Sequence, residues 1–72
     1  MPYVEIPSDN EVVAALEKLK GLATAEALCE QLVNDGHVRR DSQLAIQRTA
    51  ERGRIVIGND LMLRVASQSV AA

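Results

Sequence analysis

The sequence has very few aromatic residues and few of the residues that form disulfides or metal sites. Tyr3 is the only Phe, Tyr or Trp among 72 residues, so the core has to be built from leucine, valine, isoleucine and alanine. Cys29 is the only cysteine, which excludes an internal disulfide. A zinc site takes three or four Cys, His or carboxylate ligands, and His37 has no Cys or carboxylate partner at the spacing of a ligand set. We therefore expect no metal and no cofactor.

Long apolar runs are also absent. The longest contain four or five residues, too few for a transmembrane helix or the core of a signal peptide. We expect a cytoplasmic protein without a membrane partner. The sequence contains no Ser/His/Asp arrangement, paired carboxylates or glycine-rich phosphate loop, and the chain is short for a catalytic pocket. It is therefore not expected to be an enzyme.

The net charge of −2 conceals an asymmetry along the chain. Residues 1–36 carry seven acids and two bases, a net charge of −5, whereas residues 37–54 carry five arginines and two acids, a net charge of +3. Arginine binds phosphates and guanine in bidentate geometry better than lysine does. A basic face is one interpretation of these arginines, and ion pairing with the acidic first half is the other. They are Arg39, Arg40, Arg48, Arg52 and Arg54.

Two helices are predicted in the first half of the chain. Ser8 and Glu11 have the spacing of a capping box, so a helix should begin there and extend over residues 9–20 until Gly21 ends it. Thr24 is a good N-cap for a second helix over residues 25–35. Cys29 falls on the apolar stripe of that second helix and is interpreted as a core residue.

A third helix is predicted from Arg40 or Asp41, with Asp41 the better cap, to about Arg52. A helical wheel gives it two different sides. The side expected to face the core has the small residues Ser42, Ala45, Ile46, Thr49, Ala50 and Gly53. The side expected to face solvent has Arg40, Leu44, Gln47, Arg48, Glu51 and Arg52.

The end of the chain is predicted to form a two-stranded β-hairpin. The runs 54–57 and 61–65 are apolar and flank a turn at Gly58, Asn59 and Asp60. The expected fold is therefore a single α+β domain with three helices followed by this hairpin. Residues 1–7 are expected to form an extended arm, residues 8–66 the folded core, and residues 67–72 a flexible tail.

This order of elements resembles the winged helix-turn-helix superfamily over residues 8–66. Leu22 and Ala23 take the place of the family's short first strand, residues 43–52 fall on its recognition helix, and the hairpin takes the place of its wing. The resemblance implies DNA binding with the third helix in the major groove. The expected base contacts are Gln43, Gln47 and Arg48, and the expected phosphate contacts are Arg39, Arg40, Arg52 and Arg54.

The sequence therefore predicts a sequence-specific DNA-binding protein, a small transcriptional regulator that binds double-stranded DNA. A single unit of this size has a small footprint, so a homodimer is expected, with the apolar N-terminal arm as a candidate dimer element. The alternative is a protein-interaction module on the same fold. The acidic pI, the wing tip without Lys or Arg, and Leu44 on the outer side of the third helix favour that alternative.

Overall fold

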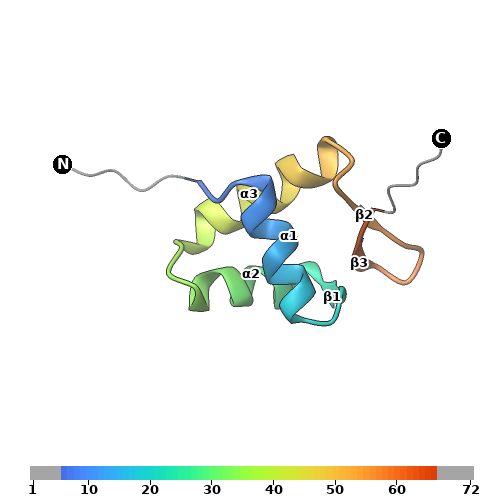
Figure 1. The fold of residues 1–72 in the computed structure, drawn as a ribbon, viewed down its shortest axis with the longest axis horizontal. Coiled ribbons are helices and arrows are strands. Elements are labelled where there is room, and N and C mark those ends of the chain that lie inside the picture. The colour runs from blue at the N-terminus through green and yellow to red at the C-terminus, as the bar shows by residue number, and fades with distance from the viewer. Residues whose placement is uncertain (1–5, 67–72) are drawn as a thin grey trace.

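The computed structural model describes residues 6–66, which form a small α+β domain (Figure 1). Three helices pack at one end of a three-stranded antiparallel sheet, whose first strand lies between the first two helices in the chain. Residues 1–5 of the predicted arm and the predicted tail over residues 67–72 lie outside the described residues. The last two residues of the predicted arm over 1–7 belong to the folded core, because Ile6 packs against it and Pro7 is buried. The elements in chain order are α1 (Asp9–Lys18), β1 (Leu22–Thr24), α2 (Ala25–Asn34), α3 (Arg39–Glu51), β2 (Ile55–Ile57) and β3 (Met62–Val65).

The capping box predicted at the start of α1 is present. The backbone N–H of Glu11 donates to Ser8 Oγ at 3.2 Å, and the Ser8 N–H donates to Glu11 Oε1 at 2.9 Å. The helix ends two residues earlier than predicted, because Lys20 and not Gly21 is the first residue to adopt a left-handed conformation, with φ of 68°. The N–H of Gly21 then donates to the carbonyl of Leu16 at 2.9 Å and closes the end of α1.

The two other helices begin differently. Thr24 caps α2 as predicted, with Oγ1 accepting the N–H of Ala27 at 3.1 Å. The prediction that Asp41 or Arg40 caps α3 is wrong, because α3 starts at Arg39 and its N-cap is Val38, which offers no side-chain hydrogen bond. Asp41 instead supplies negative charge to the first turn, where the helix dipole favours it.

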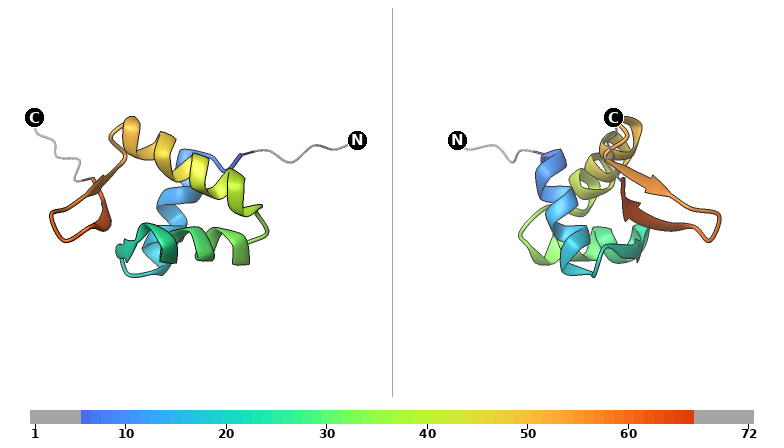
Figure 2. Two further views of the ribbon diagram at one scale, coloured as in Figure 1. Left: turned by 180° about the vertical axis from the view of Figure 1, so that it is seen from behind. Right: turned by 45° about the vertical axis from the view of Figure 1, so that its right-hand side comes forward.

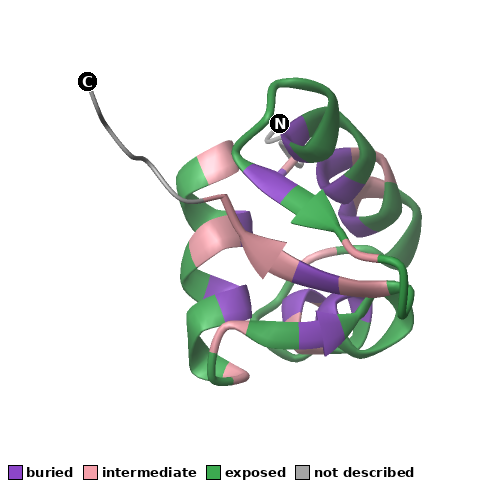
Figure 3. Ribbon diagram, turned by 90° about the vertical axis from the view of Figure 1, so that its right-hand side faces the viewer, coloured by how far each residue is buried: buried purple, intermediate pink, exposed green. Residues whose placement is uncertain are grey.

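The predicted two-stranded hairpin is part of a larger sheet. Residues 22–24, which follow α1, form β1 and pair antiparallel with β3, with Leu22 opposite Arg64 and Thr24 opposite Met62. Strand β2 pairs with the other edge of β3, so the order across the sheet is β1-β3-β2. Figure 3 shows the three strands side by side at one end of the helices. The added strand ties the chain before α2 to the C-terminal hairpin.

The hydrophobic cluster of the core is aliphatic apart from the Cys29 thiol, as the composition requires. Leu16, Leu28, Leu32 and Ile55 are its largest fully buried apolar side chains. The small-residue side of α3 packs against them, with Ser42, Ala45 and Thr49 at most 1% exposed and Ile46 at 8%. Ala50 and Gly53 were predicted on this side but are exposed. Ala50 lies at the margin of the buried stripe, and Gly53 follows the end of the helix.

The hairpin projects from the helical layer, which both views in Figure 2 make clear. Leu61 was predicted to begin the second strand, but it belongs to the turn, with φ of 65° and 70% exposure. Its N–H donates to the carbonyl of Gly58 at 2.9 Å. Three-residue hairpin loops need a left-handed residue at this position, which is normally glycine. The turn therefore places the apolar side chain of Leu61 in solvent, and its left-handed φ costs conformational energy.

Replacing Leu61 by glycine is expected to stabilise the fold by about 1 kcal/mol. Glycine removes a left-handed penalty of about 1–2 kcal/mol, and the greater freedom of the unfolded chain offsets part of that gain. Little burial is lost because the side chain is exposed. Urea unfolding measures the change. Asn59→Gly is the control, since Asn59 lacks a positive φ and should lose stability, and equal losses in both variants would contradict the assignment of strain to Leu61.

Candidate nucleic-acid interface

The three predicted base-contacting residues all have exposed side chains on α3. Gln43, Gln47 and Arg48 lie outside the buried stripe of the helix. Gln47 Nε2 donates to Glu51 Oε2 at 3.2 Å, which couples two neighbouring turns of the exposed surface. Leu44 is half-buried, so it packs partly against the interior. The uncovered surface of α3 is therefore mainly polar.

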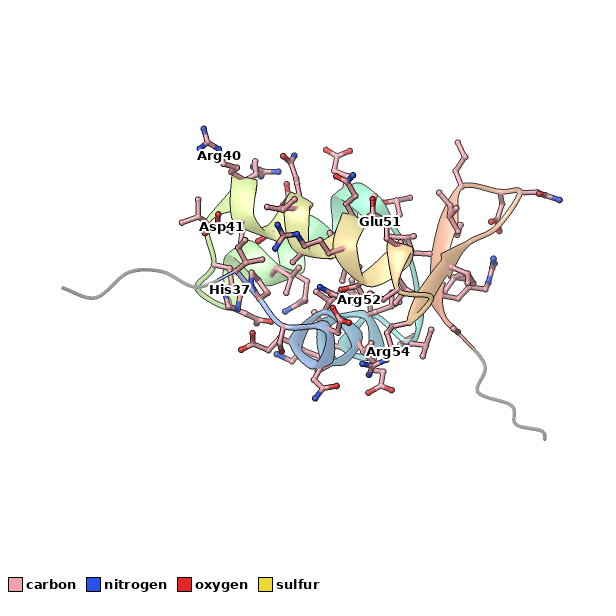
Figure 4. All side chains as sticks on the ribbon, turned by 90° about the horizontal axis from the view of Figure 1, so that it is seen from above. His37, Arg40, Asp41, Glu51, Arg52 and Arg54 are labelled. Atoms are coloured by element: carbon pink, nitrogen blue, oxygen red, sulfur yellow. The ribbon has the colours of Figure 1, made fainter. Side chains whose placement is uncertain are left out.

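The uncovered side of α3 and the hairpin project in the same direction. In Figure 4, Arg40 and Glu51 lie on the edge of α3 away from α1, which is also the side on which the hairpin loop projects. Arg52 and Arg54 lie on the opposite edge, over α1. We define the outer face as Arg40, Gln43, Gln47, Arg48 and Glu51 on α3. It is bounded by the hairpin on one side and by arginines on the other.

The predicted phosphate contacts do not share one edge of α3. Arg39 turns toward α2, where its Nη2 lies 3.3 Å from Glu30 Oε2 and its Nη1 lies 3.8 Å from the Cys29 sulfur. Among the described residues, Arg40 has no ion-pair partner. The interpretation that the arginines pair with the acidic first half therefore holds for Arg39, and also for Arg52, which pairs with Asp9, whereas Arg40 remains available on the outer face.

Three arginines gather around the start of α1. Arg48, Arg52 and Arg54 line an open hollow of about 440 Å³ together with the residues that begin that helix. Arg52 Nη1 lies 2.5 Å from Asp9 Oδ1, and Arg54 Nη2 donates to Asn10 Oδ1 at 3.0 Å. Arg48 forms no ion pair within the described part of the chain. Three guanidinium groups thus surround a single paired carboxylate, which leaves the hollow positively charged.

Asp9 connects the start of α1 to the end of α3. Its Oδ1 lies 3.0 Å from Thr49 Oγ1 as well as beside Arg52. The Thr49 hydroxyl is fully buried and also lies 2.7 Å from the carbonyl of Ala45, so its single hydrogen serves one of two acceptors at a time. The Asp9 side chain is only 17% exposed, so this contact is sheltered from water. The sequence did not reveal it because 40 residues separate the partners.

The hairpin loop presents one carboxylate and an apolar surface. Asp60 Oδ1 accepts the N–H of Met62 at 3.0 Å, and Arg64 Nη2 lies 3.1 Å from Asp60 Oδ2. The Met62 N–H first, and then the Arg64 guanidinium, lower the pKa of the Asp60 carboxyl below its usual 3.8. Ile57 beside the loop is 56% exposed. Arg64 is thus engaged within the hairpin and does not extend the outer face.

Other kinds of site find little support in residues 6–66. Within that range no cluster of three or more His, Cys, Asp or Glu side chains is placed to hold a metal ion. No helix there combines the length and apolarity needed to cross a bilayer. No protein-family model, curated protein or solved structure matches the chain. The function is therefore inferred from geometry and chemistry.

Asp9→Ala is expected to lower the free energy of unfolding by about 1–3 kcal/mol, because it removes a sheltered acceptor of a charged and a neutral donor. Arg52→Ala should cost less than about 1 kcal/mol, since Arg52 is 56% exposed. Urea unfolding of both variants tests this difference. Glu17→Ala, an exposed acid on the same helix, should change stability little, and an equally small loss in Asp9→Ala would contradict the tie between α1 and α3.

Proposed function

We propose that the chain is a winged helix-turn-helix domain that binds double-stranded DNA with α3 in the major groove, as a small sequence-specific transcriptional regulator. The observation that carries this proposal is the chain order α1-β1-α2-α3-β2-β3 with sheet order β1-β3-β2, combined with an uncovered polar side of α3 beside a projecting hairpin. In winged helices, a recognition helix followed by a hairpin provides the DNA-binding surface.

The outer face has the groups that recognise base edges. An exposed glutamine amide pairs in bidentate fashion with adenine, and an exposed guanidinium pairs with guanine. Gln43 and Gln47 provide two such amides, and Arg48 provides the guanidinium. From Arg40 to Glu51 the helix rises about 16 Å, which spans about five base pairs. One copy thus covers a short site, and a homodimer on two half-sites would supply the remaining specificity.

Phosphates lie along both sides of a helix in the major groove, so cations are useful at both edges of α3. Arg40 would serve one strand near the start of the helix. Arg52 and Arg54 in the hollow would serve the other strand, with Asp9 and Asn10 holding their guanidinium groups in place. Arg39 is engaged by Glu30 and contributes to phosphate binding only if it exchanges that partner.

The direct test is fluorescence anisotropy with random duplex DNA over a range of salt concentrations, comparing wild type with Arg40→Ala/Arg48→Ala. Neither arginine has an ion-pair partner in residues 6–66, so the variant should remain folded. The lost phosphate contact of Arg40 is expected to reduce the slope of log affinity against log salt by about one unit, and the lost guanidinium of Arg48 should lower the affinity further. Circular dichroism verifies the fold.

Lys18→Ala/Lys20→Ala is the charge-matched control, because it removes two positive charges at the end of α1, away from α3, together with the exposed ion pair of Lys18 with Asp35. It should retain most of the wild-type affinity. The proposal is wrong if folded wild-type protein does not bind duplex DNA at low salt. It is also wrong if the lysine pair and the arginine pair lose affinity equally, because binding would then follow net charge and not α3.

A protein-interaction module is the second candidate, and the exposed apolar hairpin favours it. Val56, Ile57 and Leu61 are 44%, 56% and 70% exposed, and residues 58–61 contain no Lys or Arg. A hairpin that binds phosphates usually presents cations. Exposed apolar side chains on a projecting element instead favour contact with another protein. A second copy of this chain is one such partner, and it would also provide the expected dimer.

Ile57→Ser/Leu61→Ser distinguishes these roles of the hairpin. If the hairpin forms the homodimer, sedimentation equilibrium should show the wild type as a dimer and this variant as a monomer. The affinity for a single half-site should then be unchanged within about twofold, since isolated surface substitutions have small effects. A dimer that persists in the variant would remove the hairpin as the dimer surface, and a large loss of half-site affinity would place DNA against the hairpin.

A further inference from the structure

Glu51 is the one acidic residue in the outer face, and the fold does not explain its position. It is the last residue of α3, where the negative end of the helix dipole disfavours an acid. Its side chain is exposed. The only hydrogen bond to its carboxylate within residues 6–66 comes from Gln47 on the preceding turn of the same helix. No other element of the domain uses this carboxylate.

A carboxylate in this position also opposes non-specific DNA binding. Glu51 lies on the side of α3 where Arg40 and the hairpin project, which is the side that would face the groove. An acid there repels the phosphates on both strands. Only hydrogen bonds from donors on the DNA can offset this repulsion, because an ionised carboxylate accepts hydrogen bonds and donates none. In the major groove those donors are the amino groups of cytosine N4 and adenine N6.

The hydrogen bond between Gln47 and Glu51 orients both side chains for this task. Gln47 Nε2 gives one hydrogen to Glu51 Oε2 at 3.2 Å, so it keeps a second hydrogen and a free carbonyl oxygen. That pair of groups matches N7 and N6 of adenine. Glu51 keeps acceptor capacity for a neighbouring base pair. The two residues therefore present one donor and several acceptors in a fixed order along the groove.

We propose that Glu51, held by Gln47, is a specificity-determining residue that accepts a hydrogen bond from cytosine N4 or adenine N6 and disfavours bases presenting only acceptors there. This inference rests on the proposed function and deepens it. Glu51 restricts binding to a subset of sites while lowering affinity for all other DNA. The two effects together distinguish it from an acid that is merely solvated, which would lower affinity without any base preference.

The test is selection of preferred sites from a randomised duplex pool, followed by anisotropy on the selected duplex and on its single-base-pair variants. Wild type is compared with Glu51→Gln, which retains shape and removes the charge, and with Gln47→Ala, which releases Glu51. Glu17→Gln is the matched control, because it removes the same charge from an exposed position on α1. Thermal unfolding verifies that all four proteins are folded.

Wild type is expected to discriminate by about tenfold or more at one base pair that carries cytosine or adenine. Glu51→Gln should lose most of that discrimination and bind random duplex about two- to fivefold more tightly at low salt. Gln47→Ala should weaken the same preference, and Glu17→Gln should retain it. If Glu51→Gln binds DNA with every wild-type preference intact, the inference fails and the proposed function stands. If folded wild type binds no duplex, both fail.

Discussion

Close packing of α3 against the rest of the domain is the constraint on which the structure depends. A core without Trp or Phe has few large side chains to fill space, so the elements must approach each other closely to exclude water. Small residues on α3 permit this approach, with Ser42 and Thr49 at 0% exposure and Ala45 at 1%. The hydroxyls of Ser42 and Thr49 lie 2.9 and 2.7 Å from carbonyls one turn earlier, so burying them leaves no unsatisfied polar atom.

The same packing determines which surface remains for binding. Since the narrow stripe of small residues is buried, the long polar side chains of α3 are left outside or at its edges. Ion pairs then hold the two edges, Arg39 to Glu30 of α2 at one end and Arg52 to Asp9 of α1 at the other. The arginines of the basic segment therefore have two kinds of role. Those at the edges connect helices, while Arg40 and Arg48 remain without carboxylate partners in the described residues.

The sequence predicted those features of the fold that depend on interactions between residues close together in the chain. The capping box at Ser8 and the Thr24 cap depend on neighbours within four residues, and both were found. The helical period also predicted four of the six residues expected on the buried side of α3. Features that depend on distant partners were not visible in the local pattern. Strand β1, which only the family resemblance placed at Leu22 and Ala23, forms because β3, some 40 residues later, offers it an edge. Leu61 adopts a left-handed φ because the register of β2 with β3, extended by the hydrogen bond from the Gly58 N–H to the Met62 carbonyl, leaves three residues for the loop.

In the candidate site, too, the sequence predicted local features and not contacts between distant residues. Composition identified the arginines and glutamines of α3, but not Asp9, whose contact with Thr49 and Arg52 joins chain segments 40 residues apart. An arginine held by a partly buried carboxylate loses less side-chain entropy on meeting a phosphate than a free one, though it must share its charge with that carboxylate. The acidic first half of the chain is then compatible with an anionic ligand. Its carboxylates at Asp9 and Glu30 position guanidinium groups along α3, and the uncompensated positive charge that remains lies on the outer face and in the hollow beside it.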